Sequence, residues 1–161
     1  MQFVSHLKTP IGIIQINATE SAIQSILFID EENVLKSSEE NNISKQAYNQ
    51  LLEYFNKERT YFNLPLQLNG TDFQNKVWMT LQHIPFGKTI SYLQLAKNLG
   101  DEKCIRAAGM ANGKNPFAIV IPCHRVIGKD GSLTGYAGGL WRKQWLLEHE
   151  NAFQKQASLF V

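Results

Sequence analysis

Ten residues in the C-terminal half, Ala118–Ile127, constrain this chain more than any other stretch; they run AIVIPCHRVI. The apolar residues 118–121 predict a short buried strand, which a proline then ends. The thiol of Cys123 and the imidazole of His124 follow directly after that proline. A cysteine attacks as its thiolate, and a neighbouring base or cation lowers its pKa. The stretch therefore predicts a nucleophile held at the end of a buried strand.

A second interpretation of Cys123 is that it is a small buried hydrophobic residue, because cysteine is among the residues most often found in protein interiors. Cys123 considered by itself favours neither interpretation. Side chains of neighbouring strand residues point to opposite faces. We therefore expect His124 to reach Cys123 only through a bend or a bridging water.

Length and composition narrow the class of protein. A chain of 161 residues suits one domain or two small ones. No apolar run nears the ~20 residues that a membrane helix needs. The first residues lack a basic region followed by an apolar segment, so we expect no signal peptide, a cytoplasmic location and reduced thiols. The two cysteines, Cys104 and Cys123, form no Cys-x-x-Cys pair and have no zinc-finger spacing, so no metal site is predicted.

The two halves of the chain differ in charge. Residues 1–70 carry 5 Lys/Arg against 8 Asp/Glu, a balance of −3, and residues 71–161 carry 11 against 6, a balance of +5. A basic half suggests contact with a polyanion. An ordinary solvated surface accounts for the same balance.

The first 70 residues contain patterns of regular structure and no recognisable chemistry. Residues 3–7, 11–17 and 22–29 predict strands, and the short connections between them favour an antiparallel meander. Residues 44–57 predict an amphipathic helix that Ser44 caps.

The C-terminal half predicts several short helices. Residues 62–70 predict a linker, and Thr71 and Ser91 each begin a capping-box pattern. Asp101 predicts a cap for a helix over 102–112, and a tight glycine-containing turn before it favours helix-turn-helix geometry. The alanines and glycines of that helix permit close approach of a backbone, to DNA or to another helix, and composition favours neither.

The final helix is predicted over residues 140–150 with an apolar face. That face comprises Leu140, Trp141, Trp145, Leu146 and His149.

Between Thr71 and Glu150 the chain carries a series of short blocks. They are Phe73-Gln74, Pro85-Phe86-Gly87, Ile90-Ser91-Tyr92, Arg106-Ala107, Asn115-Pro116, the Ile-Pro-Cys-His-Arg-Val core, Gly135-Tyr136 and Trp145-Leu146-Leu147. In order and spacing these blocks resemble the O6-alkylguanine-DNA alkyltransferases, also called methylated-DNA–protein-cysteine methyltransferases.

The resemblance implies an α+β fold. Residues 1–70 would form a small antiparallel-sheet, ribonuclease-H-like domain with its linker. Residues 71–161 would form a helical, winged-helix-like domain that carries the helix-turn-helix, the DNA-binding surface and the active site.

The resemblance also implies a single-turnover DNA-repair enzyme. Such a protein binds double-stranded DNA through the minor groove, flips out O6-alkylguanine and transfers the alkyl group irreversibly to its own Cys123. No cofactor is needed and a monomer suffices. Whether O4-alkylthymine is accepted, and which alkyl groups fit, stays open.

Catalytic roles follow from the resemblance residue by residue. Cys123 is the nucleophile, His124 is its base through a water, and Glu150 orients the imidazole. Tyr92 donates a hydrogen bond to the leaving oxygen, and Asn115 locks the recognition helix against the active-site turn.

Roles in binding also follow from it. Arg106 enters the base stack, and Ala107, Gly109 and Met110 lie on the helix in the minor groove. Tyr136 walls the base pocket. The N–H of Ala137 adds a donor, where many relatives carry a serine, and the carbonyls of Cys123 and Val126 accept hydrogen bonds from the guanine amine.

Two other functions remain open on the residues. A lesion sensor would bind alkylated DNA without modifying Cys123. A thiol hydrolase or redox enzyme would use Cys123 with His124, and Cys104 is the only candidate for a resolving cysteine.

Overall fold

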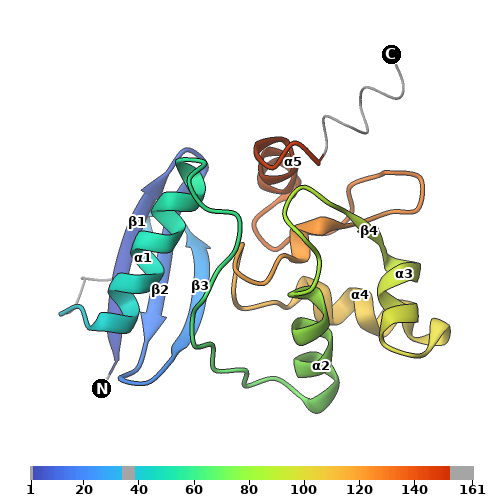
Figure 1. Cartoon of the computed structure of the whole chain (residues 1–161), viewed down its shortest axis with the longest axis horizontal. Coiled ribbons are helices and arrows are strands. Elements are labelled where there is room, and N and C mark those ends of the chain that lie inside the picture. The colour runs from blue at the N-terminus through green and yellow to red at the C-terminus, as the bar shows by residue number, and fades with distance from the viewer. Residues whose placement is uncertain (1, 34–38, 153–161) are drawn as a thin grey trace. The chain divides into compact units, whose positions relative to one another are not determined.

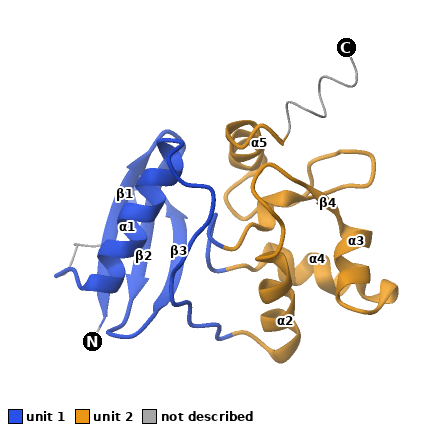
Figure 2. Cartoon of the chain, in the orientation of Figure 1, with its two compact units in different colours: residues 1–69, 116–120 blue, residues 70–115, 121–161 orange. Residues whose placement is uncertain are grey.

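The computed structural model describes residues 2–33 and 39–152 (Figure 1). The chain divides into two compact units, which Figure 2 colours separately. The first comprises Met1–Asn69 with Pro116–Val120, and the second Gly70–Asn115 with Ile121–Val161. The predicted domain boundary after residue 70 stays a prediction. No helix among the described residues is long and apolar enough to cross a membrane.

Unit 1 contains a three-stranded antiparallel sheet. Its strands are β1 (Phe3–Thr9), β2 (Gly12–Ala18) and β3 (Ile23–Ile29), in that spatial order, so the predicted meander is confirmed. A short 3-10 turn (Glu31–Asn33) follows β3. Helix α1 (Asn42–Phe55) packs against all three strands. Fully buried aliphatic side chains from β2, β3 and α1 form the core, because branched residues pack well on a pleated surface. They include Ile14, Ile16, Ile26 and Leu51.

Helix α1 begins two residues earlier than predicted. The Asn41 side chain accepts a hydrogen bond from the Ser44 N–H (2.8 Å), and the Ser44 hydroxyl accepts one from the Asn41 N–H (3.0 Å). Together the two form a capping box with Asn41 as the cap. The prediction that Ser44 caps the helix was wrong, because Asn41 is an equally good cap and allows one more half-turn of helix.

Unit 2 contains short helices and a two-stranded parallel ladder. Its elements are α2 (Asp72–Leu81), β4 (Ile90–Ser91), α3 (Tyr92–Asn98), a 3-10 turn (Glu102–Cys104), α4 (Ile105–Gly113), a 3-10 turn (Cys123–Arg125), β5 (Val126–Ile127) and α5 (Leu140–His149). Helix α4 packs against both α2 and α3. The Trp78 indole N–H donates to the Ala111 carbonyl (2.9 Å), which fixes the end of α4 on α2.

The capping predictions in unit 2 hold in part. Thr71 and Gln74 form the complete capping box expected at the start of α2. Ser91 forms only half of one, because its hydroxyl accepts from the Gln94 N–H (3.0 Å) while the Gln94 amide bonds to Asn98 instead (2.8 Å).

The start of α4 also differs from the prediction. Asp101 caps the 3-10 turn through the Lys103 N–H (2.9 Å), and α4 starts only at Ile105, without a side-chain cap. The predicted start at residue 102 was wrong because a 3-10 turn uses the same cap.

Helix α5 buries part of the predicted apolar face, including Leu146 and His149. Leu140 and Trp141 are 49% and 57% exposed. Its buried residues are Lys143, Leu146, Leu147 and His149. A lysine therefore replaces the two apolar residues that the apolar pattern had placed inside.

Candidate active site

The chain enters the site through a turn rather than the predicted strand. The Ile26 N–H donates to the Pro116 carbonyl and the Ala118 N–H to the Ile26 carbonyl, both at 2.9 Å, and the ladder stops there. Residues 118–121 then turn, and Ile119 is fully buried with φ = 71°. A β-branched residue in this region is rare, and holding it there costs about 1–3 kcal/mol. The strand prediction was wrong because a buried apolar turn and a short core strand have the same hydrophobic pattern.

Cys123, His124 and Arg125 form a single 3-10 turn, and all three are buried. The following strand β5 then pairs in parallel with β4. Because the turn spirals, the expectation that Cys123 and His124 point to opposite faces of a strand does not hold. The three side chains instead radiate from one tight loop.

Two asparagines, one in helix α4 and one two residues beyond its last residue, connect this helix to the turn. The Asn115 side chain donates to the Ile121 carbonyl (2.7 Å) and hydrogen-bonds the Cys123 thiol. The Asn112 side chain donates to the Cys123 carbonyl across a longer 3.4 Å. Asn115 was predicted to lock the helix against the turn, and that role stays a prediction. Asn112 was not predicted.

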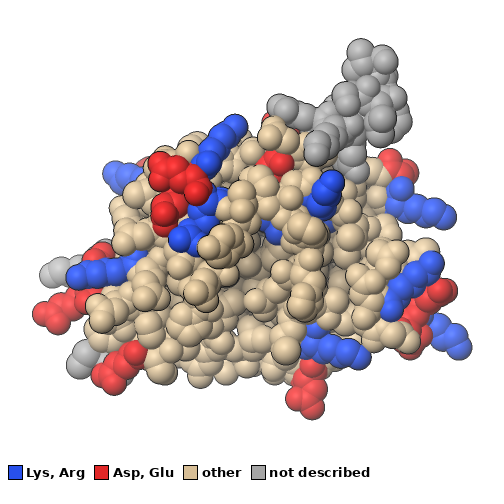
Figure 3. Space-filling model, viewed as in Figure 1, with Lys and Arg blue, Asp and Glu red and all other residues tan. Residues whose placement is uncertain are grey.

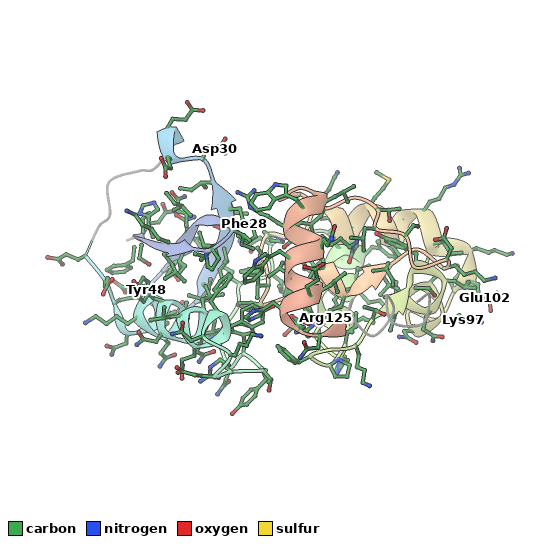
Figure 4. All side chains as sticks on the ribbon, turned by 90° about the horizontal axis from the view of Figure 1, so that it is seen from above. Phe28, Asp30, Tyr48, Lys97, Glu102 and Arg125 are labelled. Carbon is green, nitrogen blue, oxygen red and sulfur yellow. The ribbon has the colours of Figure 1, made fainter. Side chains whose placement is uncertain are left out.

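The Glu150 carboxylate is the centre of a buried hydrogen-bond cluster. It accepts from His124 Nε2 (2.8 Å), from Arg125 Nε and Nη2 (2.8 and 3.0 Å) and from the Gly87 N–H (3.4 Å). Figure 4 shows Arg125 beside α5, and its remaining Nη1 donates to the Ile84 carbonyl (2.6 Å). Burial alone raises the pKa of Glu150, but His124 and the always-charged Arg125 outweigh it and hold that pKa well below its usual value.

These hydrogen bonds determine the tautomer of His124. Burial lowers the pKa of His124 despite the attraction of Glu150, so the imidazole is neutral at pH 7. An ionised carboxylate only accepts hydrogen bonds, so Nε2 carries the proton and Nδ1 carries the lone pair. Nδ1 is buried and has no partner among the described residues. It is therefore a free base next to Cys123 in the chain.

Lys143 is an ionisable residue of the site that was not predicted. Its side chain is fully buried on α5, and Nζ donates to the Val126 carbonyl (2.7 Å) and the Thr134 carbonyl (2.8 Å). Nζ also lies 5.9 Å from the centroid of the Tyr92 ring. Burial lowers the pKa of Lys143 to about 8, and Cys123 opposes that shift. The spacing 143, 146, 147, 150 is a helical stripe that could have identified both Lys143 and Glu150.

The Cys123 thiol is neutral in this structure. Burial raises its pKa above the ordinary value, although the Asn115 hydrogen bond and the Lys143 charge both act to lower it. The expected lowering of the thiol pKa was therefore wrong for the free protein. A neutral thiol must lose its proton to a base before it can attack, and His124 Nδ1 is the candidate base.

Two tyrosines belong to the same region. The Tyr92 hydroxyl donates to the Thr134 carbonyl (3.3 Å) and accepts from the Thr134 hydroxyl (3.0 Å). The Tyr136 hydroxyl is buried and has no partner among the described residues, and burial raises its pKa well above the usual value. The Ala137 side chain, next in the chain, is exposed.

The predicted DNA-contacting residues lie on one helix. Arg106, Ala107 and Met110 are exposed on α4, Met110 by 65%. Ala107 and Met110, with residues of α2, line a shallow cavity of about 200 Å³. A side chain at Gly109 would meet Tyr92 at an ordinary 3.7 Å, so close helix packing does not require this glycine.

On the face that Figure 3 shows, charge alone does not single out a binding surface. Lys and Arg side chains are interspersed with Asp and Glu on the face shown in Figure 3. Among the described residues, no group of three His, Cys, Asp or Glu side chains is placed to hold a metal ion.

Both parts of the chain match domains of one known protein family. Residues 3–68 match the ribonuclease-like domain of 6-O-methylguanine DNA methyltransferase, and residues 72–152 match the DNA-binding domain of the same protein. A methylated-DNA–protein-cysteine methyltransferase of Mycolicibacterium paratuberculosis is 43% identical over 145 residues, which cover 88% of each chain. The predicted α+β fold and the predicted family are confirmed.

Solved structures agree. The crystal structure of the Mycobacterium tuberculosis O6-methylguanine methyltransferase superposes with a TM-score of 0.83 at 39% identity, over 94% of both chains. The same organism's protein in complex with DNA gives 0.82 at 40% identity, over 92% of both. The chain therefore belongs to the 6-O-methylguanine DNA methyltransferase family, DNA-repair enzymes that bind DNA and transfer an alkyl group from it to a cysteine.

Proposed function

We propose that this protein repairs O6-alkylguanine in double-stranded DNA by moving the alkyl group to the sulfur of Cys123, once per molecule. One observation carries the assignment of residues. The buried cluster on Glu150 fixes His124 with its Nδ1 unpaired among the described residues, in the same 3-10 turn as the only nucleophile of Cys123–Arg125.

The reaction balances without a cofactor. The Cys123 proton moves through a water to His124 Nδ1, and the imidazolium so formed is stabilised by Glu150. The sulfur then bonds to the alkyl carbon while the bond from that carbon to the guanine O6 breaks. The electron pair goes to the purine, and a proton from a nearby donor restores guanine. The product is a thioether, which no base in the site can cleave.

Substrate binding requires extrusion of the damaged nucleotide, which costs roughly a few kcal/mol. Helix α4 would lie in the minor groove, with Ala107, Gly109 and Met110 against the DNA. Arg106 would enter the stack in place of the lost base, as inserted side chains do in deformed minor grooves. The exposed side chains of Arg106, Ala107 and Met110 support this placement.

Inside the site, the developing charge on O6 needs a donor. The Tyr92 hydroxyl is the candidate, and the Ala137 N–H is a second. Tyr92 now donates to the Thr134 carbonyl, so it must exchange that acceptor for O6 when the base enters. The carbonyls of Cys123 and Val126 would accept hydrogen bonds from the purine 2-amino group, and Tyr136 would wall the pocket.

Lys143 adds a positive charge to this arrangement. Its ammonium group attracts the Cys123 sulfur and lies over the ring of Tyr92. It would favour the thiolate as charge moves through the site. A monomer contains every residue named, and the cytoplasmic location expected from the sequence would keep the Cys123 thiol reduced.

Intact-mass measurement tests the proposal. Incubation with a duplex containing O6-methylguanine should add one methyl group to the wild-type protein and to Cys104→Ser, and none to Cys123→Ser. The Cys123→Ser variant should still bind the duplex. A methyl group found on Cys104 would remove Cys123 as the acceptor, and DNA binding with no mass gain in the wild type would favour the lesion sensor.

A further inference from the structure

The two carbonyls proposed to accept the purine 2-amino group are both already held by buried side chains. Asn112 Nδ2 donates to the Cys123 carbonyl (3.4 Å), and Lys143 Nζ donates to the Val126 carbonyl (2.7 Å). A carbonyl oxygen has two lone pairs. Each side chain therefore occupies one of them and leaves the other for a ligand.

Asn112 has a second unusual feature. Its side chain is 2% exposed, and Oδ1 is sealed from solvent with no partner among the described residues. Most buried side-chain polar atoms in proteins have a partner, because an unpaired one is costly. A side-chain amide with one long donated hydrogen bond and an unpaired oxygen contributes little to the stability of the fold.

The backbone around Asn112 is fixed on both sides. The Ala111 carbonyl accepts from Trp78 (2.9 Å), and the Asn115 side chain is bonded to the Ile121 carbonyl (2.7 Å). Asn112 therefore cannot relieve its unpaired oxygen by moving the helix. The fold holds the Asn112 amide nitrogen at hydrogen-bonding distance from the Cys123 carbonyl.

We propose that Asn112 is a specificity-determining residue that makes alkyl transfer depend on the 2-amino group of the purine. This inference rests on the proposed function. Its Nδ2 directs the Cys123 carbonyl so that the free lone pair points to the amine. Guanine carries that amine and hypoxanthine lacks it, so the preference falls on alkylated guanine.

The test compares two duplexes that differ in one substituent, O6-methylguanine and O6-methylhypoxanthine, with wild type and Asn112→Leu. Leucine has a similar shape and no polar atom. Asn112→Leu should lose about tenfold in the second-order rate constant for O6-methylguanine, the scale of one lost hydrogen bond. Its rate on O6-methylhypoxanthine should change less than about twofold, because the missing amine already removes the interaction.

Stability gives a second readout. Removing a buried unpaired oxygen should leave the denaturation midpoint of Asn112→Leu unchanged or higher. Asn98→Leu is the matched control, since Asn98 bonds only Gln94 at the surface among the described residues, and it should react like the wild type with both duplexes. If Asn112→Leu does not fold, Asn112→Ser carries the same rate prediction.

The outcomes separate cleanly. A loss confined to O6-methylguanine supports the proposal. Equal losses on both duplexes would make Asn112 a general structural residue and overturn it, and so would unchanged rates on both. A wild type that methylates itself with neither duplex would instead contradict the proposed function.

Discussion

Two sets of buried polar atoms in unit 2 contrast sharply. The Glu150 carboxylate accepts four hydrogen bonds, and the Lys143 ammonium donates two at under 2.9 Å. His124 Nδ1, Asn112 Oδ1 and the Tyr136 hydroxyl are buried with no partner among the described residues. The first set is what a scaffold requires, and the second is what a binding site requires before its ligand arrives.

An unpaired buried atom does not by itself indicate a site. The Ser5 hydroxyl in unit 1 is also buried and unpaired among the described residues. What distinguishes the second set is its connection to the cysteine turn. Asn112 bonds the Cys123 carbonyl, His124 follows Cys123 directly, and Cys123 acts on the pKa of Tyr136.

Breaking the saturated set should give the largest effect. Glu150→Gln leaves the buried Arg125 guanidinium without its counter-charge, which should cost about 3 kcal/mol of unfolding free energy. Urea denaturation of the wild type and the variant measures this difference in unfolding free energy. Glu148→Gln is the matched control, because Glu148 bonds only Gln144 at the surface among the described residues and should change stability by less than about 0.5 kcal/mol. Equal costs for the two variants would contradict the scaffold assignment.

The pH dependence of stability sharpens the same point. The folded pKa of His124 lies below its unfolded value of about 6.5, and that of Glu150 below about 4.3. In both cases the unfolded chain binds more protons, so the stability is present at higher pH and is lost as pH falls. The free energy of unfolding should decline first below pH ~6.5 and again below ~4.3, and in Glu150→Gln the second decline should shrink. A free energy of unfolding of the wild type that stays constant between pH 7 and 4 would contradict this prediction.

Lys143 tests where scaffold and chemistry meet. Lys143→Met should slow alkyl transfer about tenfold at pH 7, the effect of removing one interaction worth about 1.4 kcal/mol. The pKa of Lys143 is about 8, so the wild-type lysine itself becomes neutral as pH rises through that value. The ratio of wild-type to variant rates should therefore narrow towards one by pH ~9. A ratio independent of pH would remove the charge from the mechanism.

The smallest effect is expected in the unpaired set. Tyr136→Phe deletes a hydroxyl without a partner among the described residues, so the free energy of unfolding should change by less than about 0.5 kcal/mol or increase. Tyr92→Phe deletes two hydrogen bonds with Thr134 and should cost about 1 kcal/mol. Thermal denaturation of the two variants measures both changes. A larger loss of unfolding free energy in Tyr136→Phe than in Tyr92→Phe would contradict the assignment of the Tyr136 hydroxyl to the unpaired set.

Regular elements could be predicted from local pattern. Alternating branched residues predicted the three strands and their meander, and Thr71 with Gln74 predicted the start of α2. Caps are short-range interactions, so the sequence around them contains most of the information. Errors arose where two structures share a signal, as with the cap at Ser44 and the 3-10 turn after Asp101.

The site was predicted through the family resemblance more than through periodicity. Cys123, His124 and Glu150 were named, and the structure brings His124 and Glu150 into contact at 2.8 Å. Their predicted catalytic roles stay predictions. The turn at residues 118–121 and the unfavourable φ of Ile119 could not be foreseen, because only tertiary packing stabilises them. Lys143 was missed because a lysine is almost never fully buried unless its charge is satisfied, and its two carbonyl partners are distant in sequence.

The return of Pro116–Val120 to the sheet of unit 1 has a practical consequence for anyone dissecting the molecule. Those five residues pair with β3 through Ile26, and the turn that begins at Cys123 follows three residues later. A fragment starting at residue 70 would carry every residue of the candidate site, yet the apolar loop just upstream of Cys123 would lack its partner strand. Cutting the chain at residue 70 would therefore remove the strand that holds the loop before Cys123, although it would delete no residue of the candidate site.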